Sequence, residues 1–141
     1  MQDAVKIYAV IDTNVIVSSL FSLDGSSNPA IVINAILRGT ITPLYNEEIL
    51  AEYRDVLTRP KFPFNDYMVD MVISIIRDFG INAQRKEVKG LPFPDADDIV
   101  FYEVKMSRDD AYLVTGNKKH FPKNSMVVTP AEMVEMLSGK G

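Results

Sequence analysis

The stretch Val10-Ile11-Asp12-Thr13-Asn14-Val15-Ile16 decides the fold that this sequence predicts. An apolar run over residues 5–11, interrupted by one lysine, is typical of a buried strand, and the next residue is a carboxylate. The two residues after it begin a turn. In open α/β sheets, functional groups gather just outside the carboxyl ends of the strands. Asp12 is therefore placed for chemistry at the tip of the first strand, although an acid here also suits an ordinary turn.

Composition limits the classes of protein to which the chain belongs. With 141 residues, 47% of them hydrophobic, it has the length of one domain, 1–141, and enough apolar side chains to bury a core. No apolar run approaches the roughly 20 residues of a membrane-spanning helix. No basic segment with an apolar stretch and a cleavage site precedes the first strand. We therefore expect neither a membrane span nor a secretory signal.

The chain has no cysteine and a formal net charge of −4. Disulfides, thiolate nucleophiles and cysteine-ligated metals are excluded. A reducing cytoplasm fits this composition, as other compartments also would, and we expect a cytoplasmic location. A protein that only wraps a nucleic-acid backbone is usually basic. An acidic protein acts on nucleic acid when its carboxylates bind divalent cations that meet the phosphates. The charge thus argues against a passive binder more than against a nuclease.

Strand and helix signals alternate along the chain. After the first strand and its turn we expect a polar loop over 22–27, then a helix capped by Asn28 and stopped at Gly39. Further helices are predicted over about 46–58, 65–79 and 95–107, and from Pro130 onward. Further strands are predicted over 41–45, 82–88 (weak and polar), 111–115 and 126–128. This alternation favours a parallel sheet covered by helices on both faces, the α/β class.

Helical periodicity places a second acid near the end of the sheet. Five apolar residues of the helix that follows Asn46 form one arc, and Glu52 lies at its edge beside Val56. The other acids of this helix point further into solvent; they are Glu47, Glu48 and Asp55. Glu52 is therefore the acid best placed to reach the sheet end. A boundary glutamate that extends into water is the alternative, and periodicity does not separate the two.

Three acids in four residues, Asp95, Asp97 and Asp98, open another predicted helix. Such acids are often caps and partners of the helix dipole, and Asp98 has the spacing of a capping-box partner for Asp95. The nearly continuous apolar run over 99–102 indicates that this helix start is packed. Asp95 and Asp98 share a helix face, whereas Asp97 points about 100° away. Two carboxylates on one buried face repel each other unless a cation lies between them.

The predicted strand over 111–115 ends in Thr115-Gly116-Asn117. Gly116 permits a sharp turn, the Thr115 hydroxyl can bind a neighbouring carboxylate, and Asn117 offers a neutral oxygen; a plain turn is the alternative. A small basic patch follows. It consists of Lys118, Lys119, His120 and Lys123. A lone histidine is more often a surface or packing residue than a ligand, so we assign no catalytic role to His120.

Together these acids favour a metal-dependent phosphodiesterase. Ligation by oxygen alone selects hard cations such as Mg²⁺ or Mn²⁺. Such an ion polarises a phosphoryl oxygen, activates water and stabilises the leaving oxygen, so no protein nucleophile is needed. A phosphotransferase with Asp12 as covalent nucleophile is disfavoured, because those enzymes generally need a second acid two residues on, where this chain has Asn14.

The chain resembles the PIN-domain family of small single-strand ribonucleases, which includes many bacterial toxins of toxin–antitoxin pairs. Four segments, spread over about residues 5–130, carry the resemblance in the family's order. They are Tyr8-Ala9-Val10-Ile11-Asp12-Thr13-Asn14-Val15, Ile49-Leu50-Ala51-Glu52-Tyr53, Pro94-Asp95-Ala96-Asp97-Asp98 and Tyr112-Leu113-Val114-Thr115-Gly116-Asn117. Each motif is weak alone, and the ordered set is fairly specific. It implies a three-layer α/β/α fold with a central parallel sheet of about five strands and acids at its C-terminal edge.

The resemblance also implies the site residues. Asp12, Glu52 and Asp98 become the catalytic acids and the ligands of one or two Mg²⁺ or Mn²⁺ ions, with Asp95 and Asn117 as further ligands. The direct ligand among the three acids of 95–98 stays open, and we favour Asp98 because the apolar run begins directly after it. Many family members have an acid where this chain has Asn117, so a single-metal site is better supported than a two-metal site.

The function that we expect is a divalent-metal-dependent endoribonuclease for single-stranded RNA, a toxin of a toxin–antitoxin system. One of the acids, or the ion, would activate water for in-line attack. Basic side chains would bind the RNA backbone; they are Lys118, Lys119 and Lys123, with Arg54 or Arg59. The family also implies frequent homodimers and, for toxins, an antitoxin partner. The alternative is a catalytically weak PIN-like module that binds RNA or protein without cutting.

Overall fold

The structure, a computed structural model, describes residues 6–22 and 24–140. Within these ranges no helix combines the length and the apolar character needed to cross a membrane. The strands are β1 (Ile7–Ile11), β2 (Ile41–Tyr45), β3 (Ile81–Asn82), β4 (Ala111–Val114) and β5 (Val127–Val128). The helices are α1 (Thr13–Phe21), α2 (Asn28–Leu37), α3 (Glu47–Leu57), α4 (Asp66–Phe79), α5 (Ile99–Lys105) and α6 (Pro130–Glu135). Short 3₁₀ turns cover Ala96–Asp98 and Lys118–His120, and a wider turn over Met136–Lys140 follows α6.

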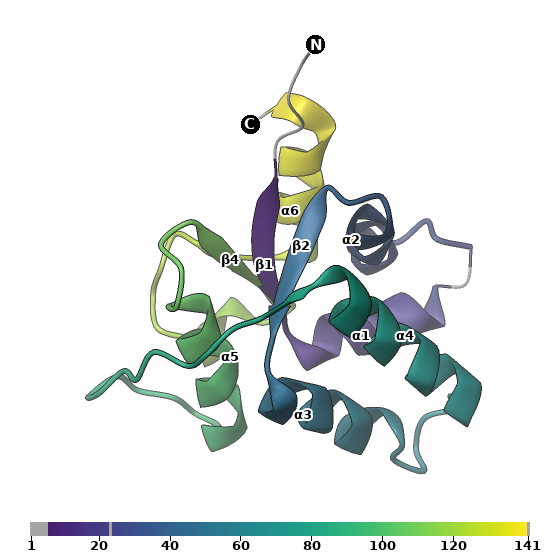
Figure 1. The fold of residues 1–141 in the computed structure, drawn as a ribbon, viewed down its shortest axis with the longest axis horizontal. Coiled ribbons are helices and arrows are strands. Elements are labelled where there is room, and N and C mark those ends of the chain that lie inside the picture. The colour runs from purple at the N-terminus through teal and green to yellow at the C-terminus, as the bar shows by residue number, and fades with distance from the viewer. Residues whose placement is uncertain (1–5, 23, 141) are drawn as a thin grey trace.

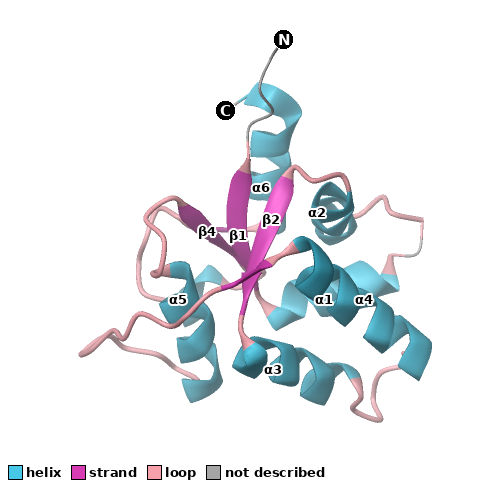
Figure 2. Ribbon diagram, in the orientation of Figure 1, coloured by secondary structure: helices cyan, strands magenta, loops and turns pink. Residues whose placement is uncertain are grey.

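The five strands form one parallel sheet in the order β3-β2-β1-β4-β5. β1 lies at its centre, between β2 and β4 (Figure 1). β1 pairs on one side with β2 and on the other with β4, whose last residue, Val114, lies opposite Ile11. Helices flank the sheet on both faces (Figure 2). The predicted three-layer α/β/α class with a parallel sheet of about five strands is confirmed. Because all strands run the same way, their carboxyl ends meet at one edge.

Short polar signals in the sequence set the ends of several helices. The side chains of Asn46 and Asn65 accept hydrogen bonds from the backbone N–H groups three residues on, at the starts of α3 and α4. Gly80 ends α4. At the start of α6, Thr129 and Glu132 bond each other's backbone N–H groups and form a complete capping box. These boundaries are local properties of the chain.

The segment directly after Asp12 corrects the sequence prediction. We expected a turn and then a polar loop, but residues 13–21 form α1, with Asp12 as its N-cap. Its apolar residues Val15, Ile16 and Leu20 are buried. The helix is short and rich in β-branched residues, which have low helix propensity, so tertiary packing of this face decides the structure. Of the expected loop over 22–27, Leu23 lies outside the described residues.

Three other boundaries also differ from the prediction. The N-cap of α2 is Ser27 rather than Asn28, because the Ser27 hydroxyl accepts the Ala30 N–H at 3.2 Å. The helix predicted over 95–107 is a 3₁₀ turn followed by α5, which ends at Lys105. Strand β3 covers two residues instead of 82–88, since the chain then leaves the sheet. There the Arg85 guanidinium donates to the carboxylates of Glu103 and Glu48.

One buried hydrogen bond joins α3 to the end of the central strand. The Tyr53 hydroxyl donates to the Ile11 carbonyl at 2.5 Å, and the Tyr53 side chain is fully buried. Burial raises the Tyr53 pKa well above 10, so its hydroxyl stays a donor. The residue before Tyr53 is Glu52. The bond therefore fixes α3, which carries Glu52, relative to β1, which ends directly before Asp12. Both acids are predicted site residues.

We predict that Tyr53→Phe lowers the free energy of unfolding by about 1–3 kcal/mol, because the buried Ile11 carbonyl loses its side-chain donor. Urea denaturation measures the change. The matched control is Tyr67→Phe. Because Tyr67 is 75% exposed, the stability of this variant should equal that of the parent protein. An equal midpoint for Tyr53→Phe and the parent protein would contradict the anchoring role.

Candidate functional site

Asp12 occupies the junction of β1 and α1, where its side chain is almost fully enclosed. It is 5% exposed. One carboxylate oxygen, Oδ1, accepts the Thr13 N–H at 2.8 Å, and Oδ2 accepts the Thr115 hydroxyl at 2.7 Å and the Asn14 amide at 3.2 Å. Burial raises the Asp12 pKa, and these bonds oppose the rise without cancelling it. The carboxylate is thus fixed in orientation at an electrostatically unfavourable position.

The ends of β1 and β4 are locked together around this carboxylate. The Asn14 side chain bridges them, since its amide donates to Asp12 and its carbonyl accepts the Gly116 N–H at 3.0 Å. A Cβ atom at position 116 would lie 3.3 Å from that Asn14 oxygen, so a larger residue here would press on the bridging side chain. The Thr115 hydroxyl also accepts the Asn117 N–H at 3.1 Å. The predicted contact of Thr115 with a neighbouring carboxylate is confirmed, and that carboxylate is Asp12.

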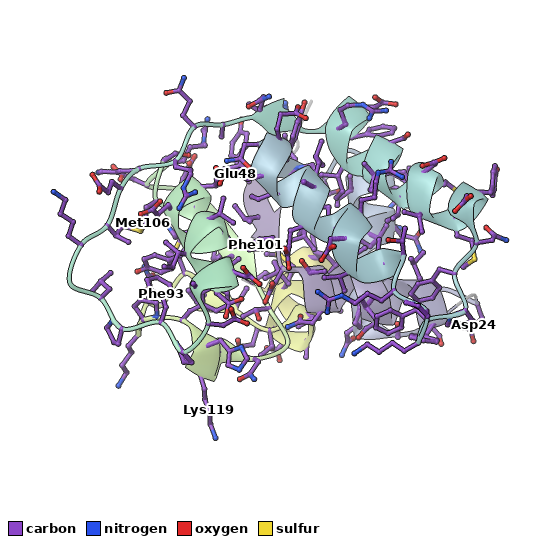
Figure 3. The ribbon with its side chains drawn as sticks, turned by 90° about the horizontal axis from the view of Figure 1, so that it is seen from below. Asp24, Glu48, Phe93, Phe101, Met106 and Lys119 are labelled. Carbon is purple, nitrogen blue, oxygen red and sulfur yellow. The ribbon has the colours of Figure 1, made fainter. Side chains whose placement is uncertain are left out.

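A cleft of about 350 Å³ opens at this edge of the sheet, with α3 on one side and the start of α5 on the other. Five carboxylates line it: Asp12, Glu52, Asp95, Asp97 and Asp98. Figure 3 shows the molecule from this edge, with Phe101 of α5 near its centre. The fold therefore brings together four of the five predicted metal ligands, which come from three separate parts of the chain.

Asp98 is the least satisfied acid of the cleft. Its Oδ2 is buried, and no group in the described ranges donates a hydrogen bond to it. The nearest basic atom is Nδ1 of His120, at 3.4 Å. Burial, then the charges of Asp12 and Asp95, raise the Asp98 pKa from 3.8 to about 6, although His120 opposes the rise. This carboxylate has an oxygen available for a ligand and strong electrostatic reason to bind a cation.

The capping box suggested by the spacing of Asp95 and Asp98 is not formed. The Asp95 carboxylate caps the turn by accepting the Asp97 N–H at 2.9 Å, but the Asp98 side chain makes no capping bond. An aspartate is one methylene shorter than the glutamate that usually fills this role. The unused Asp98 carboxylate faces the cleft instead.

Asp97 also lines the cleft, which the sequence analysis did not expect. We predicted that it points about 100° away from its neighbours because we assumed an α-helix. The three residues from Ala96 to Asp98 form a 3₁₀ turn, which has about 3.0 residues per turn and places side chains differently. Which of the three acids of 95–98 is the direct ligand stays a prediction.

Glu52 lies on α3 at the side of the cleft, where its side chain is half-buried. Burial, then the charges of Asp97 and Asp55, raise its pKa, and the charge of Arg59 opposes this. The Glu52 carboxylate is thus repelled by the Asp97 carboxylate, which belongs to the turn on the opposite side of the cleft. Its position beside Val56 at the edge of the apolar face agrees with the helical periodicity.

The other predicted residues, Asn117 and the basic side chains expected to bind RNA, lie around the cleft rather than in it. Asn117 lines a neighbouring hollow together with Asn14 and Pro130, so the structure does not bring its side chain to the carboxylates. Lys118, Lys119 and Lys123 line a third hollow of about 510 Å³ beside β5. Three of the predicted basic residues form ion pairs: Lys118 with Glu132, Arg54 with Asp70 and Arg59 with Asp55.

Several cleft residues were not anticipated as site residues. His120 lines the cleft because the 3₁₀ turn after Asn117 returns the chain toward α5. Thr13 also lines it, and its hydroxyl oxygen is buried with no hydrogen-bond partner among residues 6–22 and 24–140. Phe62, from the loop between α3 and α4, forms part of the wall. Thr13 and His120 lie in segments that the sequence analysis singled out, but only tertiary contacts show that their side chains, and that of Phe62, line the cleft.

The donor set of the cleft suits a hard divalent cation. In the part of the chain that the structure describes, however, no three Asp, Glu or His side chains lie close enough together to coordinate one ion. The donors are oxygen atoms, as Mg²⁺ and Mn²⁺ prefer. The charges of Asp12 and Asp95 raise the Asp98 pKa, and one buried oxygen of Asp98 has no donor in the described residues. A cation between these carboxylates would remove the repulsion.

A family model of the PIN domain matches residues 8–119. The chain belongs to the PIN-domain family. The matched range runs from β1 to the turn at Lys118–His120 and contains every carboxylate of the cleft. PIN domains are generally nucleases that use divalent metal ions, which agrees with the chemistry of this cleft. No curated protein and no solved structure matches the chain.

The raised pKa of Asp98 predicts a pH-dependent effect of Asp98→Asn on stability. Because the folded-state pKa of about 6 exceeds the ordinary 3.8, the folded protein binds this proton more tightly than the unfolded chain. Ionisation therefore lowers stability as the pH rises through this window. In metal-free buffer at about pH 7.5, we expect the free energy of unfolding of Asp98→Asn to exceed that of the parent protein by about 1–2 kcal/mol. This gain in stability should vanish near pH 4.

Urea denaturation at both pH values measures this difference. Asp97→Asn is the matched control, because Asp97 lies in the same turn but is exposed, and its stability gain should be smaller. A pH-independent effect of Asp98→Asn, or a loss of stability at the higher pH, would show that the repulsion is absent.

Proposed function

We propose that this PIN domain is a divalent-metal-dependent endoribonuclease that hydrolyses phosphodiester bonds of single-stranded RNA. The observation that carries the proposal is the meeting of Asp12, Glu52 and Asp98 in one cleft at the C-terminal edge of the sheet. Asp12 is fixed by three hydrogen bonds, whereas Asp98 keeps a buried oxygen without a donor. The basic groups nearby, His120 beside Asp98 and Arg59 near Glu52, oppose the rise of the pKa values of these acids but leave both raised.

The proposed roles follow from these positions. Asp12, Glu52 and Asp98 hold Mg²⁺ or Mn²⁺, with Asp95 as a further ligand at the exposed side of the cleft. When bound, the ion polarises the scissile phosphate and makes the attacking water more acidic. Thr115 keeps Asp12 oriented toward the cleft, and one of the carboxylates accepts the proton of the water. Asn117, whose N–H donates to the Thr115 hydroxyl and which lines the neighbouring hollow, stays a predicted further ligand.

Basic residues near the cleft would bind the RNA strand. Lys119 extends into solvent at the edge of the molecule seen in Figure 3, and Lys118 and Lys123 line the same hollow beside β5. His120 connects this hollow to the acid cleft, because it lies between Lys119 and Phe121 in sequence and lines the cleft itself. We expect the RNA backbone to follow this path toward the carboxylates.

The cellular role that we propose is that of a toxin in a toxin–antitoxin pair, with an antitoxin protein as partner and a homodimer as assembly. The support for these three statements is membership of the PIN-domain family alone. Cleavage of RNA by the purified chain, and its suppression by the product of a small neighbouring gene, would test the toxin role and the antitoxin partner.

We predict that Asp12→Asn, Glu52→Gln and Asp98→Asn each reduce cleavage of a single-stranded RNA with Mg²⁺ or Mn²⁺ by at least about 100-fold, since changes beside metal ligands already cost 10–100-fold. Gel analysis of an end-labelled RNA measures the rate. Glu47→Gln is the matched control, because Glu47 is an exposed acid on α3, the helix that carries Glu52. The cleavage rate of this variant should equal that of the parent protein.

Equal cleavage by the parent and Asp12→Asn would show that the activity lies elsewhere. A parent protein that binds RNA but cleaves none with either ion would support the alternative, a PIN-like module that binds RNA or protein without hydrolysis. Circular dichroism of each variant shows whether a lost activity reflects a lost fold.

A further inference from the structure

Three phenylalanines, one exposed and two half-buried, form a group next to the acid cleft, which we call the aromatic cluster (Phe21, Phe62 and Phe64). Phe21 is the last residue of α1, and the other two belong to the loop between α3 and α4. The ring centroids of Phe21 and Phe64 are 4.9 Å apart, and those of Phe62 and Phe64 are 5.4 Å apart with planes inclined by 14°. Phe21 is 57% exposed. Phe64 packs partly against the hydrophobic core, whereas Phe21 and Phe62 are not among the residues that contact it.

The aromatic cluster adjoins the proposed catalytic residues. Phe62 lines the same cleft as Asp12 and Glu52, so one ring of the cluster forms part of the cleft wall. The ammonium group of the neighbouring Lys61 lies 5.2 Å from the centroid of the Phe62 ring. The surface next to the acids thus combines flat apolar rings with a positive charge.

This combination has the chemistry of a site for unpaired nucleotides. Bases of single-stranded RNA stack on aromatic side chains with little dependence on sequence, because every base has a π face. The exposed Lys61 side chain, whose ammonium lies over the Phe62 ring, would leave the ring face to the base and meet the phosphate of the same nucleotide. Bases inside a duplex already stack on each other and are not free to do this. The cluster would therefore favour single strands over duplexes.

We propose that the aromatic cluster is the stacking platform for the base of a nucleotide that flanks the scissile phosphate of single-stranded RNA. This proposal rests on the proposed function, because the position of the scissile phosphate follows from the carboxylates. Phe62 would contact the base nearest the cleft, and the more exposed Phe21 would extend the platform outward. Lys61 would contact the adjoining phosphate.

A second copy of the chain is a poorer occupant of this surface. With one ring 57% exposed and two half-buried, the cluster exposes at most about 250 Å² of aromatic surface. Stable protein interfaces bury about 800 Å² on each partner. The size of the cluster suits one or two stacked bases better than a subunit contact.

Binding of a short single-stranded RNA that carries the fluorescent base 2-aminopurine tests the proposal. The measurements use the full chain with Asp98→Asn, in EDTA, so that the RNA stays intact and the cleft repels phosphate less. Adding Phe21→Ala or Phe62→Leu should weaken binding at least about fivefold for each ring, and should reduce the change in 2-aminopurine fluorescence. Phe21→Tyr should retain both signals, because tyrosine keeps an aromatic face.

Phe79→Ala is the matched control. Phe79 is 47% exposed and lies at the far end of α4 from the cluster, about 20 Å along the helix, so its loss should leave RNA binding unchanged. Equal RNA affinity with and without Phe21 and Phe62 would overturn the proposal. So would sedimentation that shows a dimer which Phe21→Ala converts into a monomer, because the cluster would then join two copies.

Failure of the proposed function gives a different result. If the parent chain cleaves no RNA with Mg²⁺ or Mn²⁺ but loses affinity on removal of the rings, the stacking platform stands and the nuclease assignment does not. If the parent cleaves RNA and ring removal changes neither affinity nor fluorescence, the nuclease assignment stands and the platform does not.

Discussion

Burial of a carboxylate at the end of the central strand is the constraint on which the site depends. Asp12 gives up nearly all contact with water, and an isolated charge in such a place would be strongly unfavourable. Three donors compensate it in part: the Thr13 backbone, the Asn14 amide and the Thr115 hydroxyl. Since these bonds join the ends of β1 and β4, Asp12 cannot turn away from the other acids.

The rest of the fold brings further negative charge toward this fixed point. Tyr53 bonds the end of β1 and thereby sets the position of α3, which carries Glu52. The 3₁₀ turn before α5 presents Asp98 with an oxygen that no donor in the described residues satisfies. The pKa values of Asp12, Glu52 and Asp98 are all raised, chiefly by burial. The protein thus contains an electrostatic conflict that a divalent cation would resolve.

The sequence predicts the layer arrangement well, because it depends on local signals. The caps at Asn46, Asn65 and Thr129 and the apolar runs of the strands mark most elements, and the parallel sheet follows from their alternation. Helix α1 escaped prediction because its β-branched residues do not favour a helix on their own, and its packing is a tertiary effect.

For the candidate site, the sequence places acids at strand ends and on a helix edge but cannot show which oxygen stays unbonded. That Asp97 faces the cleft depends on a 3₁₀ turn, which α-helical periodicity does not describe. His120 and the aromatic cluster belong to the site region through contacts between distant segments. Asn117, which the resemblance suggested as a ligand, lies in the neighbouring hollow.

The most direct test of this account is calorimetric titration of Mn²⁺ into the metal-free protein, compared with Asp12→Asn and Thr115→Val. We expect the parent to bind the ion, Asp12→Asn to lose binding, and Thr115→Val to bind about 10–100-fold more weakly because its Asp12 is no longer held by the hydroxyl. Equal Mn²⁺ affinity in all three proteins, or no binding by the parent, would contradict the claim that these acids form a cation site.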